Sequence, residues 1–150
     1  MDLILWRHAD AEAGAPDAAR VLTAKGTKQA KKMAKWLKSH LPENYRIIAS
    51  PARRAQQTAQ ALNANYATLK EIGAAASAKT LLVAAGWPDA QVTVVVVGHQ
   101  PTLGQTAALL MCGTEVDWSI KKGAIWWLAS RQDNDETQVV VRAVISTDML

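Results

Sequence analysis

The chain has 150 residues, of which 49% are hydrophobic and 20% charged, and this balance predicts one globular domain over residues 1–150. No apolar run approaches the roughly 20 residues that cross a bilayer, and residues 1–6 lack the pattern of a secretory signal, so we expect a cytoplasmic protein without membrane contact. A single cysteine, Cys112, excludes an intrachain disulfide and agrees with that location.

The formal net charge is +4, and much of the excess comes from one predicted helix that ends near His40. The lysines of this helix fall on one side at about 100° per residue, opposite an apolar stripe. They are Lys25, Lys28, Lys31, Lys32, Lys35 and Lys38. A solvent-exposed face explains this pattern, and a docking surface for an acidic partner is the alternative. Trp36 falls beside the lysines and adds some support to a contact surface. No recognition module for nucleic acid is present, so we expect no nucleic-acid partner.

Strand-like and helix-like segments alternate along the first half of the chain. Residues 3–6 form a short apolar run, which predicts a buried strand. The lysine-rich helix follows, with Thr23 as its N-cap. Residues 46–49 predict a second strand. Ser50 and Pro51 then have the pattern of a helix start, with Ser50 as the N-cap and Pro51 at the first helical position.

The second half continues the alternation. Residues 78–85 predict a helix, residues 92–97 a central strand of β-branched side chains, and Pro101 the opening of a further helix. Two final strands are predicted at residues 124–129 and 139–144, with a polar turn between them at residues 132–137. Fully apolar strands that alternate with helices predict an α/β fold, a three-layer sandwich with a mostly parallel central sheet.

Residues suited to phosphate chemistry follow three of these predicted strands. His8 follows the first, Ser50 and Arg54 follow the second, and His99 follows the strand at residues 92–97. In a parallel sheet, ligands bind at the carboxyl ends of the strands, so we expect these side chains to meet. Arginine matches phosphate oxygens bidentately, helix N-termini favour anions, and imidazole can act as nucleophile or donor. Each feature alone is weak, and their shared position predicts a phosphate pocket.

Three other kinds of site receive less support. A metal site would need carboxylates beside both histidines, whereas Asp10 and Glu12 lie near His8 and none flanks His99. The neighbouring arginines would also repel a cation, so we expect neither a metal nor another cofactor. A serine triad would need a Gly-x-Ser-x-Gly elbow, which is absent. Cys112 lies near a helix end rather than after a strand, and we expect it in the core.

Four segments of the chain resemble motifs of the histidine phosphatase superfamily. Residues 7–9, Arg-His-Ala, resemble its Arg-His-Gly signature. Residues 50–58, Ser-Pro-Ala-Arg-Arg-Ala-Gln-Gln-Thr, resemble its Ser-Pro-x-x-Arg-Ala-x-Gln-Thr segment. Residues 98–103, Gly-His-Gln-Pro-Thr-Leu, are similar to its second histidine motif, and residues 20–26, Arg-Val-Leu-Thr-Ala-Lys-Gly, to the Arg-x-Leu-Thr-x-x-Gly stretch of one branch. The small size and this pattern are most similar to SixA-type phosphohistidine phosphatases.

The resemblance implies a phosphoglycerate mutase-like fold and a set of residue roles. By position, His8 becomes the phosphorylated nucleophile, and Arg7, Arg54 and His99 the phosphate pocket. The remaining matched side chains, assigned to substrate binding, are Arg20 and Ser50. Residue 9 is alanine where the superfamily usually has glycine, a change that SixA-like members tolerate.

The implied activity is metal-independent dephosphorylation of a phosphohistidine protein, such as a histidine phosphotransfer domain, through a phospho-His8 intermediate. We expect the protein to act as a monomer, with short loops that leave the pocket open to a protein substrate. Two alternatives remain. One is a small-molecule phosphomonoesterase of the same superfamily, acting on a small phosphorylated substrate. The other is a non-catalytic phosphate-binding module.

The identity of a general acid distinguishes these alternatives. Many superfamily members use an acidic proton donor, and the candidates here are Glu71, Asp10 and Glu12, none with a convincing setting. An ester needs such a donor because alkoxide leaves poorly, whereas imidazole leaves more readily, so its absence suits phosphohistidine. We expect the adjacent arginines to lower the pKa of His8 and keep it neutral, and His99 to be protonated so that it donates fully.

Overall fold

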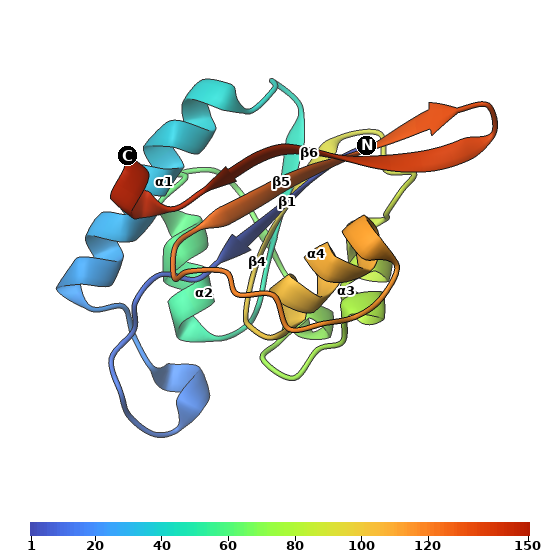
Figure 1. Cartoon of the computed structure of the whole chain (residues 1–150). Helices are drawn as coiled ribbons and strands as arrows, with labels where there is room; N and C mark the ends of the chain where they lie inside the picture. Colours follow the sequence, from blue (N-terminus) through green and yellow to red (C-terminus); the bar gives the residue numbers. More distant parts are fainter.

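A six-stranded sheet forms the middle of the protein in a computed structural model that describes residues 1–150 (Figure 1). Its strand order is β3-β2-β4-β1-β5-β6. The strands are β1 (Asp2–Arg7), β2 (Tyr45–Ala49), β3 (Ala67–Thr68), β4 (Thr93–Gly98), β5 (Ile125–Asp133) and β6 (Glu136–Ile145). The pairs β3–β2, β2–β4 and β4–β1 are parallel, and β5 is antiparallel to both β1 and β6. Only β5 therefore runs against the other strands.

Helices cover both faces of the sheet, and this arrangement confirms the predicted three-layer sandwich with a mostly parallel sheet (Figure 1). The helices are α1 (Ala24–His40), α2 (Arg53–Gln60), α3 (Ala78–Ala85) and α4 (Thr102–Cys112). Helices α1 and α2 pack on the face that presents Ile4 and Trp6, and α3 and α4 on the face that presents Leu3 and Leu5. All four of these β1 side chains are 0% exposed, because successive residues of a strand point to opposite, covered faces.

The lysine-rich helix α1 forms as predicted. The Thr23 hydroxyl oxygen accepts a hydrogen bond from the Gly26 amide at 2.9 Å, and the lysines lie on the exposed side. Trp36 is half-buried, stacks on His40 with ring centroids 4.1 Å apart, and meets Trp127 edge-on. Trp36 therefore contributes to the packing of α1 against the sheet, and the rest of its ring stays exposed.

Three local predictions are wrong: the start of α2, the length of the polar turn and the burial of Cys112. Helix α2 begins at Arg53, because the Ser50 hydroxyl oxygen accepts from the Ala52 amide at 3.2 Å within a turn that precedes the helix. The polar turn predicted at residues 132–137 is limited to two residues, Asn134 and Asp135, and the strands extend through the rest. These two residues have positive φ angles of 50° and 66°, the backbone that two-residue hairpins require and that Asn and Asp tolerate.

Cys112 is exposed at the last position of α4 rather than buried in the core. Residues 66–76, which lack a clear sequence pattern, contain the short strand β3 and a 3-10 turn, η2 (Lys70–Ile72). Two other 3-10 turns are η1 (Asp17–Ala19) and η3 (Thr147–Met149). None of the helices has the length and apolarity that crossing a membrane requires.

The register of the three central strands places their last residues at one level. Val97 of β4 lies opposite Trp6 of β1 and opposite Ala49 of β2. Beyond the strands, the His8 amide donates to the Gly98 carbonyl at 3.1 Å, and the Ser50 amide donates to the Val97 carbonyl at 3.0 Å. His8, Ser50 and His99 therefore leave the sheet side by side at the same edge.

The closest approach of α1 to the loop after β1 yields a stability prediction. A Cβ atom at Gly26 would lie 1.9 Å from the backbone oxygen of Asp10. We expect Gly26→Ala to lower the free energy of unfolding by about 2–3 kcal/mol, because this overlap outweighs the roughly 1 kcal/mol that alanine gains in a helix. Urea denaturation, monitored by tryptophan fluorescence, measures this change in the free energy of unfolding. Lys31→Ala, on the exposed side of α1, should change stability by less than about 0.5 kcal/mol. A Gly26→Ala protein as stable as the parent would contradict the prediction.

Candidate active site

The imidazole of His8 is held in one tautomer. Its Nδ1 lies 2.8 Å from the carbonyl oxygen of Ala9, which can only accept, so Nδ1 carries the proton. Nε2 therefore keeps its lone pair and accepts from Nε of Arg54 at 3.3 Å. Thr58 fixes this geometry, because its hydroxyl donates to the Arg54 carbonyl at 2.8 Å and accepts from the Ala9 amide at 3.1 Å. Thr58 ends the second motif of the sequence, which was the available signal for its role.

His99 faces His8 across the site, with ring centroids 5.2 Å apart. Nη2 of Arg54 lies 3.4 Å from Nδ1 of His99, and a guanidinium can only donate, so Nδ1 is the acceptor. Nε2 of His99 then carries the proton and donates to the Ser50 hydroxyl at 2.7 Å. The structure thus brings together residues from the ends of β1, β2 and β4 and the first turn of α2.

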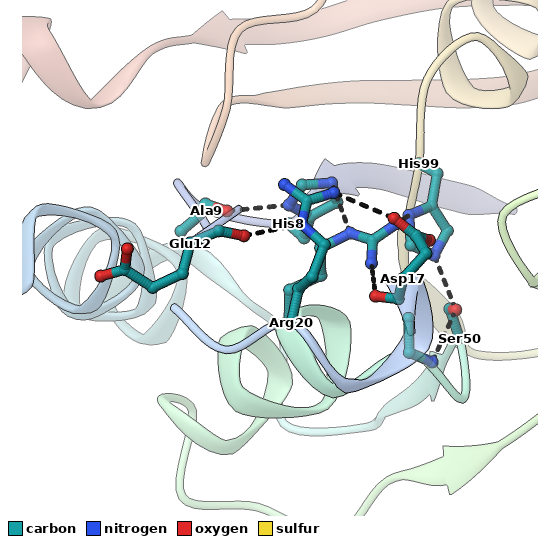
Figure 2. A network of polar contacts seen from close by, with 9 residues as sticks. His8, Ala9, Glu12, Asp17, Arg20, Ser50 and His99 are labelled. Atoms are coloured by element: carbon teal, nitrogen blue, oxygen red, sulfur yellow. Dashed lines mark hydrogen bonds and ion pairs between the residues drawn. The ribbon is translucent and has the colours of Figure 1, made fainter. Parts of the chain in front are cut away.

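Asp17, which sequence analysis did not identify, lies near Arg20 and His99 (Figure 2) and forms an ion pair with Arg54. Nη1 of Arg54 donates to the Asp17 carbonyl oxygen at 2.9 Å, and Nη2 donates to its carboxylate Oδ2 at 3.1 Å. The other carboxylate oxygen accepts from Nη1 of Arg20 at 3.0 Å. The only sequence signal was an acid three residues before Arg20 in the loop after His8. These bonds, with Arg20 the stronger influence and Arg54 next, lower the pKa of Asp17, so it is a carboxylate at neutral pH.

Arg7 and Arg20 complete the cationic surroundings of His8. Nη1 of Arg7 donates to the Ile120 carbonyl at 2.7 Å, whereas its buried Nε has no protein partner. Arg20 is anchored through Nε, which donates to the Glu12 carbonyl at 2.6 Å. A buried donor without an acceptor is uncommon, and an oxyanion would satisfy it.

Both site imidazoles are neutral at pH 7. Burial lowers the pKa of His8 to about 4, and the charges of Arg54, Arg7 and Arg20 act in the same direction, while the bond to Ala9 opposes them. Burial also lowers the pKa of His99 to about 3, with the charges of His8 and Arg54 adding to the effect. The direction expected for His8 is confirmed, although burial rather than the arginines is its main cause. The expectation of a protonated His99 is wrong for this arrangement.

None of the three expected acids hydrogen-bonds either imidazole. Asp10 accepts from Lys122 at 2.9 Å and from the Thr23 hydroxyl at 2.8 Å, and Glu12 contributes only backbone atoms to the network. Glu71 is exposed in the middle of η2 and has no side-chain hydrogen bond or ion pair. No group of three or more His, Cys, Asp or Glu side chains is placed to hold a metal ion.

The site is closed rather than open. His8 is 7% exposed, Arg54 5% and His99 3%, and the η1 turn that carries Asp17 lies against Arg54. The expectation of an open pocket is therefore wrong for this structure. The contacts of Asp17 occupy both terminal nitrogens of the Arg54 guanidinium.

The depressed pKa values yield a titration prediction. In NMR titrations, the ring protons of His8 and His99 should show midpoints near pH 4 and pH 3 instead of near 6.5. The unfolded chain then binds more protons than the folded protein below pH about 6.5, so the free energy of unfolding should fall as the pH drops toward 4. His99→Gln should flatten this dependence. A midpoint above pH 6 for both rings would contradict the burial argument.

Comparisons with known proteins agree with this geometry. The family model described as "Histidine phosphatase superfamily (branch 1)" matches residues 3–74. The phosphohistidine phosphatase SixA of Escherichia coli is 41% identical over 59 residues, which cover 39% of this chain and 37% of that protein. The SixA homolog of Haemophilus influenzae is 42% identical over 69 residues, covering 42% of each chain. The aligned stretches thus span about two fifths of the length of these curated relatives.

Structural similarity extends along almost the whole chain. The solved structure of the protein histidine phosphatase SixA complexed with tungstate superimposes with a TM-score of 0.79 and 25% identity, covering 99% of both chains. The fold is therefore the phosphoglycerate mutase-like α/β sandwich that the motifs implied. The matched motifs, the fold and the meeting of the two histidines at one sheet edge agree with one another: the chain is similar to the histidine phosphatase superfamily and to its SixA proteins.

Proposed function

We propose that this chain is a phosphatase that hydrolyses phosphohistidine on a protein through a phospho-His8 intermediate and without a metal ion. One observation carries the proposal: the bond from Nδ1 of His8 to the Ala9 carbonyl leaves Nε2 unprotonated and facing Arg54. A nucleophile needs this lone pair, and its pKa near 4 keeps it available at neutral pH.

Phosphoryl transfer begins when Nε2 of His8 attacks phosphorus in line with the leaving nitrogen. The new bond joins Nε2 to phosphorus, and the old phosphorus–nitrogen bond breaks. The other ring nitrogen of the substrate phosphohistidine carries a proton, so the electron pair of the broken bond departs on a neutral imidazole. A water molecule then attacks phospho-His8, the bond to Nε2 breaks, and inorganic phosphate leaves. His8 returns with its original lone pair and tautomer.

The surrounding donors stabilise the charge on the three equatorial oxygens. Arg54 turns its N–H groups from His8 and Asp17 to the phosphoryl group, and Arg7 offers its unpartnered Nε. Ser50 holds His99 through Nε2 and so aims Nδ1 into the site. A phosphoryl dianion beside that ring favours its imidazolium form, which makes Nδ1 a donor. Arg20 contributes to substrate binding indirectly. It pairs with the same Asp17 carboxylate that Arg54 pairs with, and so helps to hold that carboxylate when Arg54 turns to the substrate.

The substrate class follows from the leaving group. Asp17 lies at the site, but its pKa is lowered and it holds no proton to give at neutral pH. Imidazole, whose conjugate acid has a pKa of about 6.5, departs without the strong proton donor that an alkoxide needs. The names of the SixA relatives support the same substrate class. A phosphorylated protein, such as a histidine phosphotransfer domain, is therefore the proposed partner.

His8→Ala should lower turnover of a phosphohistidine protein by at least about a thousandfold, because no other group can form the covalent intermediate. Phosphate release from a phosphohistidine protein, a phosphoserine peptide and a simple phosphate ester measures the preference. His40→Ala, at an exposed histidine, is the matched control and should leave the rate unchanged. EDTA should have no effect.

Two results would redirect this assignment. If Glu71→Gln or Glu12→Gln removed ester hydrolysis selectively, the protein would be a small-molecule phosphomonoesterase with a proton donor. If phosphate bound tightly and nothing turned over in the parent protein, a non-catalytic phosphate-binding module would replace the enzyme.

Asp17→Asn should tighten the binding of inorganic phosphate about tenfold, measured by isothermal titration calorimetry. The carboxylate holds the same guanidinium that phosphate needs, and a charge-assisted hydrogen bond is worth about 1.5–3 kcal/mol. Glu12→Gln removes the same charge nearby without any side-chain contact to Arg54, and its affinity should stay at the parent value. Weaker binding by Asp17→Asn would mean that Asp17 organises the arginines instead of competing with phosphate.

A further inference from the structure

A second cationic site lies beside the first half of α1. A pocket of about 800 Å³ opens between this helix, the turn that precedes β5 and the segment that follows β6. No hydrophobic residue lines it. Its lining includes five lysines: Lys25, Lys28, Lys32, Lys121 and Lys122. His8, Arg54 and His99 do not line this pocket, whereas Arg7 does, so the pocket adjoins the phosphoryl site and shares one arginine with it.

The charges in this pocket are only partly balanced. Lys121 pairs with Asp148 at 3.4 Å, and Lys122 pairs with Asp10 at 2.9 Å. The three lysines of α1, at positions 25, 28 and 32, form no ion pair and no side-chain hydrogen bond. Their spacing of three and four residues puts them on one face, where like charges repel. The fold therefore gathers three unpaired ammonium groups around a hollow that two further lysines also border.

The wall of the pocket is hydrogen-bonded to the backbone of residues 7–10, the segment that contains His8. The Gly123 amide donates to the carbonyl oxygens of Arg7 and His8, both at 3.1 Å. Gly123 packs closely on Gln29 of the pocket lining, since a Cβ there would lie 3.2 Å from that side chain. Gln29 in turn accepts from the Asp10 amide at 2.9 Å. The lysines thus stand on a wall whose backbone is fixed by hydrogen bonds.

We propose that this pocket binds a small polyanion, an oligophosphate with three or more negative charges. Lysine is a compact point charge that binds phosphate from several directions, and three unpaired lysines match three phosphate groups. The volume falls within the usual range for small-molecule sites. An acidic protein surface fits less well, because the centre of a protein interface is apolar and this lining has no apolar residue. The inference does not depend on the proposed phosphatase activity.

Isothermal titration calorimetry with inorganic triphosphate tests the site. The parent protein should bind it, and the double variant Lys28→Ala/Lys32→Ala should bind at least tenfold more weakly. Lys31→Ala/Lys35→Ala removes the same charge from the same helix but from residues outside this pocket, and its affinity should stay within threefold of the parent. If both double variants lost the same triphosphate affinity, the attraction would be non-specific and the proposal would be overturned. A dissociation constant above about 1 mM for the parent protein would also overturn it.

Two further measurements separate this site from the phosphoryl site and identify the ligand. Triphosphate should still bind Arg54→Ala, and in the parent protein it should shift the amide NMR signals of Gln29 and Gly123. Shifts confined to His8 and His99 would place the ligand in the phosphoryl site and refute the proposal, even if Arg54→Ala did not fold. If ATP bound as tightly as triphosphate, the ligand would be a nucleotide. If ATP bound more weakly, the ligand would be an inorganic oligophosphate. Hexaglutamate binding as tightly as triphosphate would refute a phosphate site in favour of an acidic protein surface.

Discussion

The parallel pairing of β4 with β1 on one side and β2 on the other is the constraint on which the rest of the structure depends. Val97 lies opposite both Trp6 and Ala49, so the three chains leave the sheet together and their next residues must be neighbours. Helices on both faces bury the carboxyl-terminal halves of these strands, where close packing limits backbone movement. The register of the strands thereby sets the positions of His8, Ser50 and His99 independently of their side-chain polar contacts.

Burial then decides the electrostatics of the site. Moving two imidazoles out of water favours their neutral forms, which suits a nucleophile but costs the protein a cationic donor at His99. Arg54 cannot lose its proton, so its charge has to be met by an anion. Asp17 meets it from a 3-10 turn, with both a backbone and a carboxylate oxygen. Under the proposed function, a phosphoryl group takes over the same donors, and Asp17 then competes with it for Arg54.

The positive charge of the chain has two different arrangements. Around His8 the arginines are anchored by backbone carbonyls and by the carboxylate of Asp17, and they act on His8 over short distances. Along α1 the lysines stand in solvent, where water and salt screen them and only a concave wall concentrates their effect. The positive charge of the chain is therefore divided between buried arginines around His8 and exposed lysines along α1.

The sequence by itself determined the layered α/β fold, the capped helix α1 and the meeting of His8, Arg54, Ser50 and His99, because these depend on apolar periodicity and on which residues follow strands. It did not reveal that α2 starts at Arg53, since a hydroxyl that caps a turn and one that caps a helix have the same local pattern. Nor did it reveal Asp17, the neutral state of His99 or the depth of burial. Only the tertiary structure decided these, because they depend on distances between segments that no local pattern encodes.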